Sequence, residues 1–263
     1  MIVFISLLGL AVGSFLNVLV DRLPRSKSIV KERSHCDKCK KTLKWYDLIP
    51  LFSFIILKGK CHYCSTPLSF YYPVVELTTG ILFVVVLFFV GSINVINFIN
   101  FIFYLFLIGS LIVVFFADLK YGIIPDKIIF PAIAVSFLYF LINHSPASPT
   151  GGSLIINHLF SAVGASLFFL LLFLITKGKG MGFGDVKFAF LMGLILGFPN
   201  IIVGLYVAFL TGAIIGCILI LWRKKRVFGT AIPFGPFLVI GTLVSIFLGN
   251  FLFQNFLHIM ALR

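Results

Sequence analysis

Long apolar runs separated by short polar segments dominate the hydrophobic pattern of this chain. The runs lie at residues 2–20, 74–90, 98–117, 128–143, 154–176, 186–198, 201–221 and 236–257. Most of them have the length that a helix needs to cross a bilayer, and they lack the alternating period of barrel strands. The pattern therefore predicts an all-α polytopic membrane protein with about eight transmembrane helices, of which the sixth is short.

Composition supports this class. Hydrophobic residues make up 60% of the 263 residues and charged residues 11%, and the mean hydropathy is +1.15, which is outside the range of ordinary soluble domains. No basic residue precedes the first apolar run, so we expect residues 1–20 to stay as a first transmembrane helix rather than to be a cleaved signal peptide.

The net charge of +13 is distributed as a topology signal. Residues 21–73 hold 11 of the 21 Lys and Arg residues. With eight spans, all the remaining basic residues except Arg263 fall on the same side, which the positive-inside rule makes cytoplasmic. We interpret this charge as orientation signal and attraction to anionic membrane lipid, and we expect no nucleic-acid partner.

Two acids stand at the ends of apolar runs on this same side. Asp118 ends the third run, and Asp185 follows the glycine-rich stretch KGKGMGFG at 177–184. Two carboxylates held close together share one proton, so that one can act as a base and the other as an acid on a peptide bond. Each acid could instead cap a helix or pair with a neighbouring lysine. Asp126, which also suits a plain helix start, is the runner-up acid.

Residues 21–73 form the only polar segment long enough for a small domain. Cys36, Cys39, Cys61 and Cys64 are arranged as two CxxC pairs, a spacing that lets four thiolates bind one tetrahedral ion. We favour structural zinc over disulfides because the charge pattern places this loop in a reducing compartment. His35 and His62 flank the pairs and are not needed as ligands. The apolar stretch at 45–59 suits the membrane interface.

Two further polar residues lie in apolar runs. Asn17 in the first run could hydrogen-bond across helices or take part in chemistry. Glu76 in the second run could be structural or functional, since acids inside a membrane are candidates for function.

Taken together, these motifs resemble one family. GSFLNVLVDRLP near the start, the two CxxC pairs, YYPVVELTTG, the Asp118 segment, GFGDVK and IPFGPFL are similar, in order, to motifs of the type IV prepilin peptidase family of leader peptidases and N-methyltransferases. The resemblance implies an aspartic membrane protease of the GxGD kind with Asp118 and Asp185 as its catalytic pair.

The resemblance also implies substrates and a second activity. The substrates would be type IV prepilins or pseudopilins, cut on the cytoplasmic side of the bacterial inner membrane. The new N-terminal residue would then be methylated by S-adenosylmethionine, with Gly59 and Lys60 as contributors to methyl transfer.

The resulting hypothesis divides the chain into a first transmembrane helix at 1–20, a four-cysteine cytoplasmic subdomain at 21–73 and a transmembrane peptidase domain at 74–263. Two alternatives from other classes are a cation-coupled transporter that uses the same acids and a zinc-bound adaptor without chemistry. Transporters commonly show internal repeats, and the sequence shows none.

Overall fold

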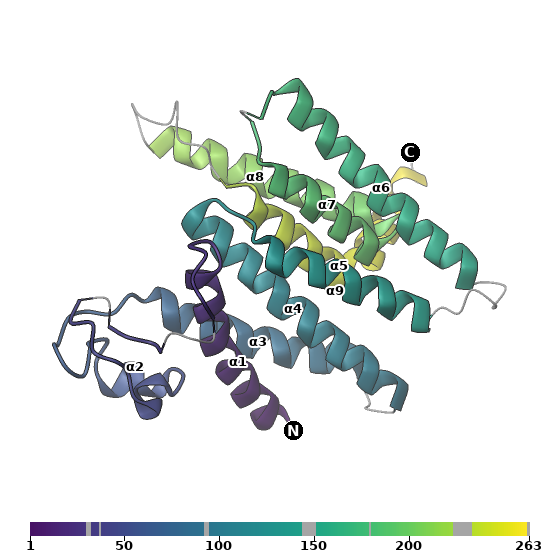
Figure 1. The fold of residues 1–263 in the computed structure, drawn as a ribbon. Helices are drawn as coiled ribbons and strands as arrows, with labels where there is room; N and C mark the ends of the chain where they lie inside the picture. Colours follow the sequence, from purple (N-terminus) through teal and green to yellow (C-terminus); the bar gives the residue numbers. More distant parts are fainter. Residues whose placement is uncertain are drawn as a thin grey trace. The chain divides into compact units, whose positions relative to one another are not determined.

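The computed structural model describes residues 1–29, 33–36, 38–91, 95–143, 151–178, 180–222 and 233–261. Figure 1 shows the helices as ribbons. They are α1 (Ile2–Arg22), the 3₁₀ helix η1 (Trp45–Leu48), α2 (Phe52–Ile56), α3 (Tyr71–Val90), α4 (Val95–Tyr121), α5 (Asp126–Asn143), α6 (Gly151–Ile175), α7 (Phe183–Leu196), α8 (Asn200–Trp222) and α9 (Gly235–Ala261). The basic cluster at 223–226, the segment at 227–232 and most of the loop at 143–153 lie outside the described residues.

Seven of the described helices are long and apolar enough to cross a membrane: α1, α3, α4, α5, α6, α8 and α9. The sixth predicted run forms α7, which has only 14 residues. In α8 the most apolar window has a mean hydropathy of 2.5, yet only 17% of it is buried within the protein. A surface this apolar is compatible with lipid rather than with water. The all-α polytopic membrane fold predicted from the hydrophobic runs is confirmed.

The chain forms two compact units, residues 1–116 and 117–263. The boundary falls inside α4, so that the last turn of this helix, with Asp118, belongs to the second unit.

The first unit is organised by close packing of α1 against α3. A Cβ atom on Gly9 would lie 2.7 Å from the Cα of Gly80, and one on Gly13 would lie 2.7 Å from the Cα of Glu76. One turn further along α1, the amide nitrogen of Asn17 donates a hydrogen bond to the carbonyl of Tyr72 at 3.1 Å. The helices therefore run antiparallel with a fixed register, and small residues let their backbones touch, as is common between membrane helices.

The second unit is organised around α7. This helix packs against α5, α6, α8 and α9, and most of its side chains are buried, including Phe188, Leu191 and Met192. Gly193 lies so close to α6 that a Cβ atom would be 2.6 Å from the Cα of Ala162. A short helix enclosed by others holds its first turn, which carries Asp185, in a fixed position.

The connection between α1 and α3 carries the cysteines, η1 and α2. Its apolar side chains are exposed, among them Trp45, Phe52, Ile55 and Ile56. Exposed aromatic and aliphatic side chains on short helices suit a membrane interface, so the predicted interfacial location of residues 45–59 stays a prediction.

Candidate active site and metal centre

Asp118 lies in the last turn of α4 and is 6% exposed. Its Oδ2 atom accepts a hydrogen bond from the backbone N–H of Gly235 at 2.8 Å. Gly235 is the first residue of α9, and the N–H groups at a helix start attract negative charge. Pro236 follows, at a helix position where a missing N–H does no harm. The start of α9 therefore holds the Asp118 carboxylate.

Asp185 is the third residue of α7 and is 5% exposed. Its Oδ2 atom accepts a hydrogen bond from the backbone N–H of Gly182 at 3.1 Å, which caps the helix. The capping interaction predicted as the plain alternative is thus present. A carboxylate that caps a helix with one oxygen keeps its second oxygen available for proton transfer. Capping is therefore compatible with a catalytic role for Asp185.

The fold brings these two acids together although 67 positions separate them in the sequence. Both lie in the second unit, both are buried, and the charge of Asp118 acts on Asp185 through space. Each also accepts one backbone hydrogen bond at a helix start. Two neighbouring buried carboxylates are most stable with one proton between them. The pair can therefore supply a base and an acid at one place.

Asp126 has a different environment. Its Oδ1 atom lies 2.6 Å from the Nζ atom of Lys187, and its side chain is 54% exposed. The ion pair links the start of α5 to α7 and neutralises Asp126. The runner-up acid is therefore paired with a lysine and does not take part in the buried pair of acids.

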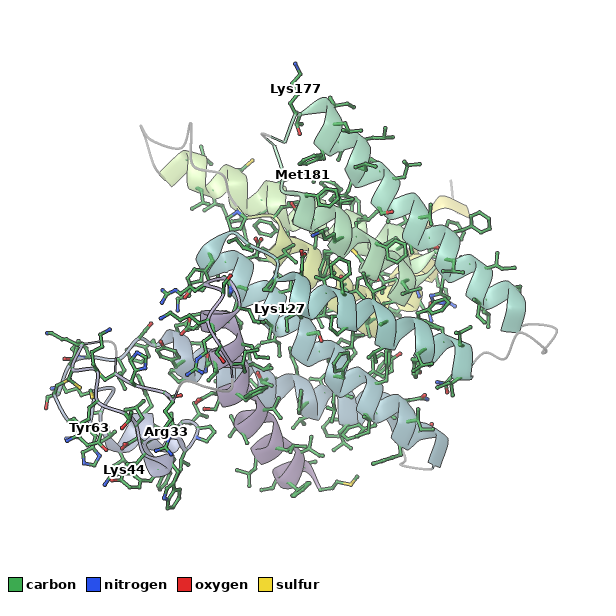
Figure 2. All side chains as sticks on the ribbon, viewed as in Figure 1. Arg33, Lys44, Tyr63, Lys127, Lys177 and Met181 are labelled. Carbon is green, nitrogen blue, oxygen red and sulfur yellow. The ribbon has the colours of Figure 1, made fainter. Side chains whose placement is uncertain are left out.

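Two glycines have a steric role at this site. A Cβ atom on Gly184 would lie 3.0 Å from the Cβ of Ile124, and one on Gly235 would lie 2.6 Å from the Oδ2 of Asp118. Figure 2 labels Lys177 and Met181 in the connection that leads from α6 into this region. Sequence reasoning did not identify Gly235 as a hydrogen-bonding partner of Asp118.

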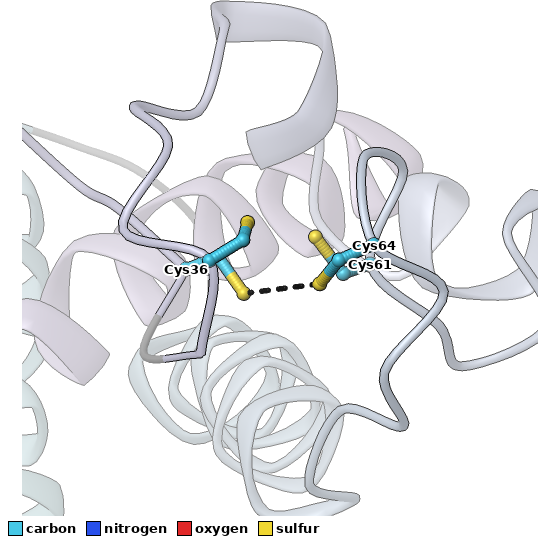
Figure 3. Close-up of side chains that lie close together, drawn as sticks. Cys36, Cys61 and Cys64 are labelled. Carbon is cyan, nitrogen blue, oxygen red and sulfur yellow. Dashed lines mark hydrogen bonds between the residues drawn. The ribbon is translucent and has the colours of Figure 1, made fainter.

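The four cysteines form a compact cluster in the first unit. One sulfur atom from each of Cys36, Cys39, Cys61 and Cys64 lies within 4.8 Å of every other. The sulfurs of Cys36 and Cys64 are 3.8 Å apart, and Figure 3 shows them facing each other. Zinc–sulfur bonds of about 2.3 Å give a tetrahedron with edges of about 3.8 Å. The residues therefore fit one tetrahedral metal ion, and neither His35 nor His62 belongs to the cluster.

The two CxxC turns share one backbone design. The N–H of Cys36 donates to the carbonyl of Lys41 at 3.0 Å, and the N–H of Cys61 donates to the carbonyl of Thr66, also five residues on, at 2.8 Å. In each turn the fourth residue after the first cysteine, Lys40 or Ser65, has a positive φ. This equivalence presents the two pairs of sulfurs to a shared centre.

Asp47 attaches the second turn to η1. Its side chain is 3% exposed, and its Oδ1 atom lies 3.1 Å from the Nδ1 atom of His62. Its Oδ2 atom accepts hydrogen bonds from the hydroxyl of Tyr63 at 3.2 Å and the backbone N–H of Lys44 at 3.0 Å; Figure 2 labels Tyr63 and Lys44 in this region. Because His62 and Tyr63 stand between Cys61 and Cys64, Asp47 orients both sulfurs of that turn.

The thiols of the cluster differ in acidity. The hydrogen bond from the hydroxyl of Thr66 lowers the pKa of Cys64 to about 6. At Cys39 a backbone hydrogen bond at Lys41 acts in the same direction, but desolvation and the neighbouring sulfurs outweigh it and raise the pKa to about 11. One cysteine of the cluster thus loses its proton readily, and its negative charge disfavours ionisation of the neighbouring thiols. A bound cation would offset this repulsion between thiolates.

Gly59 and Lys60 immediately precede Cys61. Gly59 has a φ of +68°, and a Cβ atom there would lie 3.1 Å from the ring of Phe54. Its carbonyl accepts a hydrogen bond from the N–H of Leu68 at 2.7 Å. The positive φ and the close ring favour glycine at this position on structural grounds, whereas Lys60 is exposed.

Fold and site together define a polytopic helical membrane protein with a buried pair of acids and a four-cysteine centre. Residues 7–90 match the model of the Bacterial Peptidase A24 N-terminal domain, and residues 105–217, which contain both acids, match that of the Type IV leader peptidase family. No solved structure matches the chain significantly.

Curated relatives cover nearly the whole chain. A prepilin leader peptidase/N-methyltransferase of Xanthomonas campestris pv. campestris is 32% identical over 97% of this chain and 94% of its own length. Proteins of the same name from Bacillus subtilis and Pseudomonas aeruginosa are 31% and 29% identical, over 95% and 96% of this chain and 95% and 92% of their own lengths. The chain belongs to the prepilin leader peptidase/N-methyltransferase family. Nothing in these comparisons supports a cation-coupled transporter.

Proposed function

We propose that this protein removes the basic leader from type IV prepilins or pseudopilins and then methylates the new N-terminal amino group. Asp118 and Asp185 are the catalytic pair for cleavage. The observation that carries this proposal is the convergence of two buried carboxylates, each held by one backbone N–H at a helix start, in a chain of this family.

Cleavage by such a pair needs no covalent intermediate. The ionised carboxylate takes a proton from a water molecule, whose oxygen attacks the scissile carbonyl, while the protonated partner donates a hydrogen bond to the carbonyl oxygen. The tetrahedral intermediate then collapses, the C–N bond breaks and the departing nitrogen takes up a proton from the pair. The N–H groups of Gly182 and Gly235 fix the orientation of the two carboxylates through both steps.

We propose the bacterial inner membrane as the location, with the acids at its cytoplasmic edge. The concentration of basic residues at 21–73 supports this orientation under the positive-inside rule. A prepilin helix lying in the bilayer would then present its scissile bond at the level of the acids. The substrate and the surrounding lipid are the partners of the protein in this scheme.

The methyl-transfer activity is assigned to the first unit. We propose that Cys36, Cys39, Cys61 and Cys64 bind structural zinc, because the cluster fits a tetrahedral ion. S-adenosylmethionine supplies the methyl group when bound, and Gly59 and Lys60 contribute to its transfer. Zinc would fix the turn that carries these two residues.

The experiment is reconstitution of the purified full chain in lipid with a prepilin and S-adenosylmethionine, read by mass spectrometry of the substrate. Loss of the leader followed by the addition of one methyl group supports the proposal. An unchanged prepilin, with the protein folded and inserted, would contradict it.

A further inference from the structure

A buried polar cluster at the α1–α3 interface is not used by the cleavage mechanism. The register of these helices places Gly13 against Glu76 and, one turn along, Asn17 against Tyr72. Glu76 and Asn17 thus stand on facing helices and about one helical turn, roughly 5.4 Å, apart along the interface. Both side chains are more than nine-tenths buried, with exposures of 8% and 6%.

The Glu76 carboxylate has only neutral partners in the described part of the chain. Its Oε2 atom accepts the backbone N–H of Leu51 at 2.9 Å, and the hydroxyl of Ser14 is a second hydrogen-bonding partner. No described cation forms a salt bridge with it. An anionic carboxylate in such surroundings is stabilised strongly by any cation that reaches it.

Asn17 presents an acceptor without a donor. Its Nδ2 atom is engaged by the carbonyl of Tyr72, which fixes the orientation of the amide. Its Oδ1 atom is buried, and no described group donates a hydrogen bond to it. Buried amide oxygens nearly always have a partner, and an unpaired one is costly. This oxygen therefore suits a ligand that brings N–H groups.

We propose that Glu76 and Asn17 bind the free α-amino group of the cleaved substrate and that Glu76 takes its proton before methyl transfer. This inference rests on the proposed function and names the amine site within it. A primary ammonium carries three N–H donors, and two hydrogen bonds of about 2.9 Å each would let one nitrogen span roughly one helical turn. A metal ion would need more oxygen ligands than these two side chains offer.

The methyl group comes from a sulfonium methyl donor, which is the co-reactant of the amine. The ammonium gives one proton to the Glu76 carboxylate and becomes a neutral amine. Its nitrogen lone pair attacks the methyl carbon, a C–N bond forms, and the C–S bond breaks to leave a thioether. The product is a methylammonium, and the proton on Glu76 leaves to solvent.

The cluster also links this chemistry to the cysteine centre. Leu51, whose N–H binds Glu76, has a φ of +56° and precedes α2, and Gly59 follows that helix. The carboxylate thus anchors the segment that leads to Gly59, Lys60 and Cys61. A purely structural anchor would need only a hydrogen-bond acceptor, which glutamine also supplies.

A binding measurement on the full-length protein tests the site without turnover. The probes are two synthetic peptides that begin at the first residue after the leader, one with a free amino group and one N-acetylated. We expect wild-type protein to prefer the free amine by at least about tenfold, since a hydrogen bond to a charged group contributes about 1.5–3 kcal/mol. Glu76→Gln and Asn17→Leu should remove the preference, and Thr79→Val, a buried control on α3, should keep it. Equal binding of both peptides by wild type, or a preference retained in Glu76→Gln, would overturn the proposal.

Rates of methylation and of leader removal distinguish a failure of the amine site from a failure of the proposed function. Glu76→Gln should lower methylation by about 100-fold or more while leader removal and metal content stay at wild-type levels. Methylation at the wild-type rate in this variant, or a parallel loss of cleavage or metal, would assign Glu76 a structural role and refute the amine site. Failure of wild-type protein to methylate would instead refute the proposed function.

Discussion

Asp118 and Gly235 are 117 positions apart in the sequence, yet the backbone N–H of Gly235 donates a 2.8 Å hydrogen bond to the Oδ2 atom of Asp118. This bond places a buried carboxylate at the first residue of α9. A Cβ atom on Gly235 would lie 2.6 Å from the same oxygen, closer than van der Waals contact allows. The position of the carboxylate therefore depends on the absence of a side chain there.

We predict that Gly235→Ala lowers leader removal at least about tenfold, because small displacements of a catalytic group are costly. The measurement is the initial rate of cleavage at equal amounts of membrane-inserted protein. Gly216→Ala is the matched control, since a Cβ atom at that position meets nothing within 4 Å. Equal rates in the two variants would show that the contact does not matter.

The two glycines of the GxGD stretch should differ in their tolerance of alanine. Gly184 faces Ile124, which a new Cβ would approach to 3.0 Å, whereas at Gly182 the nearest atom would be 3.8 Å away. Gly184→Ala must therefore shift the first turn of α7, and we expect it to lower cleavage more than Gly182→Ala does. A larger loss in Gly182→Ala would mean that the substrate, rather than Ile124, sets the demand for glycine.

Packing of α1 on α3 should be sensitive to one added methyl group. Gly13→Ala brings a Cβ to 2.7 Å from the backbone of Glu76, and overpacking of this kind typically costs about 1–3 kcal/mol of unfolding free energy. We expect a lower midpoint of thermal unfolding in detergent. Gly109→Ala, where the nearest atom is 4.0 Å away, serves as the control, and equal midpoints for the two variants would contradict the close contact.

Removal of metal should affect the first unit. We predict one zinc ion per wild-type chain, and less zinc with reduced methylation in Cys61→Ser. Cys217 lies on α8 outside the cluster, so Cys217→Ser should keep the full zinc content. The measurement is the zinc content of freshly reduced protein by elemental analysis. Wild-type protein without zinc would contradict the proposed zinc site.

The sequence predicted the helices well because the bilayer imposes length and hydrophobicity on each span. The two pairs of cysteines were predicted equally well, because the geometry of a short CxxC turn is determined by adjacent residues. In contrast, the bond between Asp118 and Gly235 depends on how α4 and α9 meet, and no local pattern encodes that. The register of α1 against α3 could not be predicted for the same reason. The spacing of Gly9 and Gly13, four positions apart, nevertheless indicated close helix packing.

The partner of Asp126 could not be predicted from the sequence either. Asp126 stands near Asp118 in the sequence, and the sequence made it the runner-up acid. Only the fold reveals that Lys187 on α7 pairs with it. Charge patterns give the composition of a surface, whereas the pairing of individual charges depends on tertiary structure.

The central claim is that Asp118 and Asp185 act as one catalytic pair. Its most direct test is the mass of a prepilin co-expressed with wild-type protein, Asp118→Asn, Asp185→Asn or the control Asp126→Asn, each verified to insert at equal levels. The account predicts full-length prepilin with either variant of the pair and leader-free product with Asp126→Asn. Leader-free product in cells that carry Asp118→Asn or Asp185→Asn would contradict it.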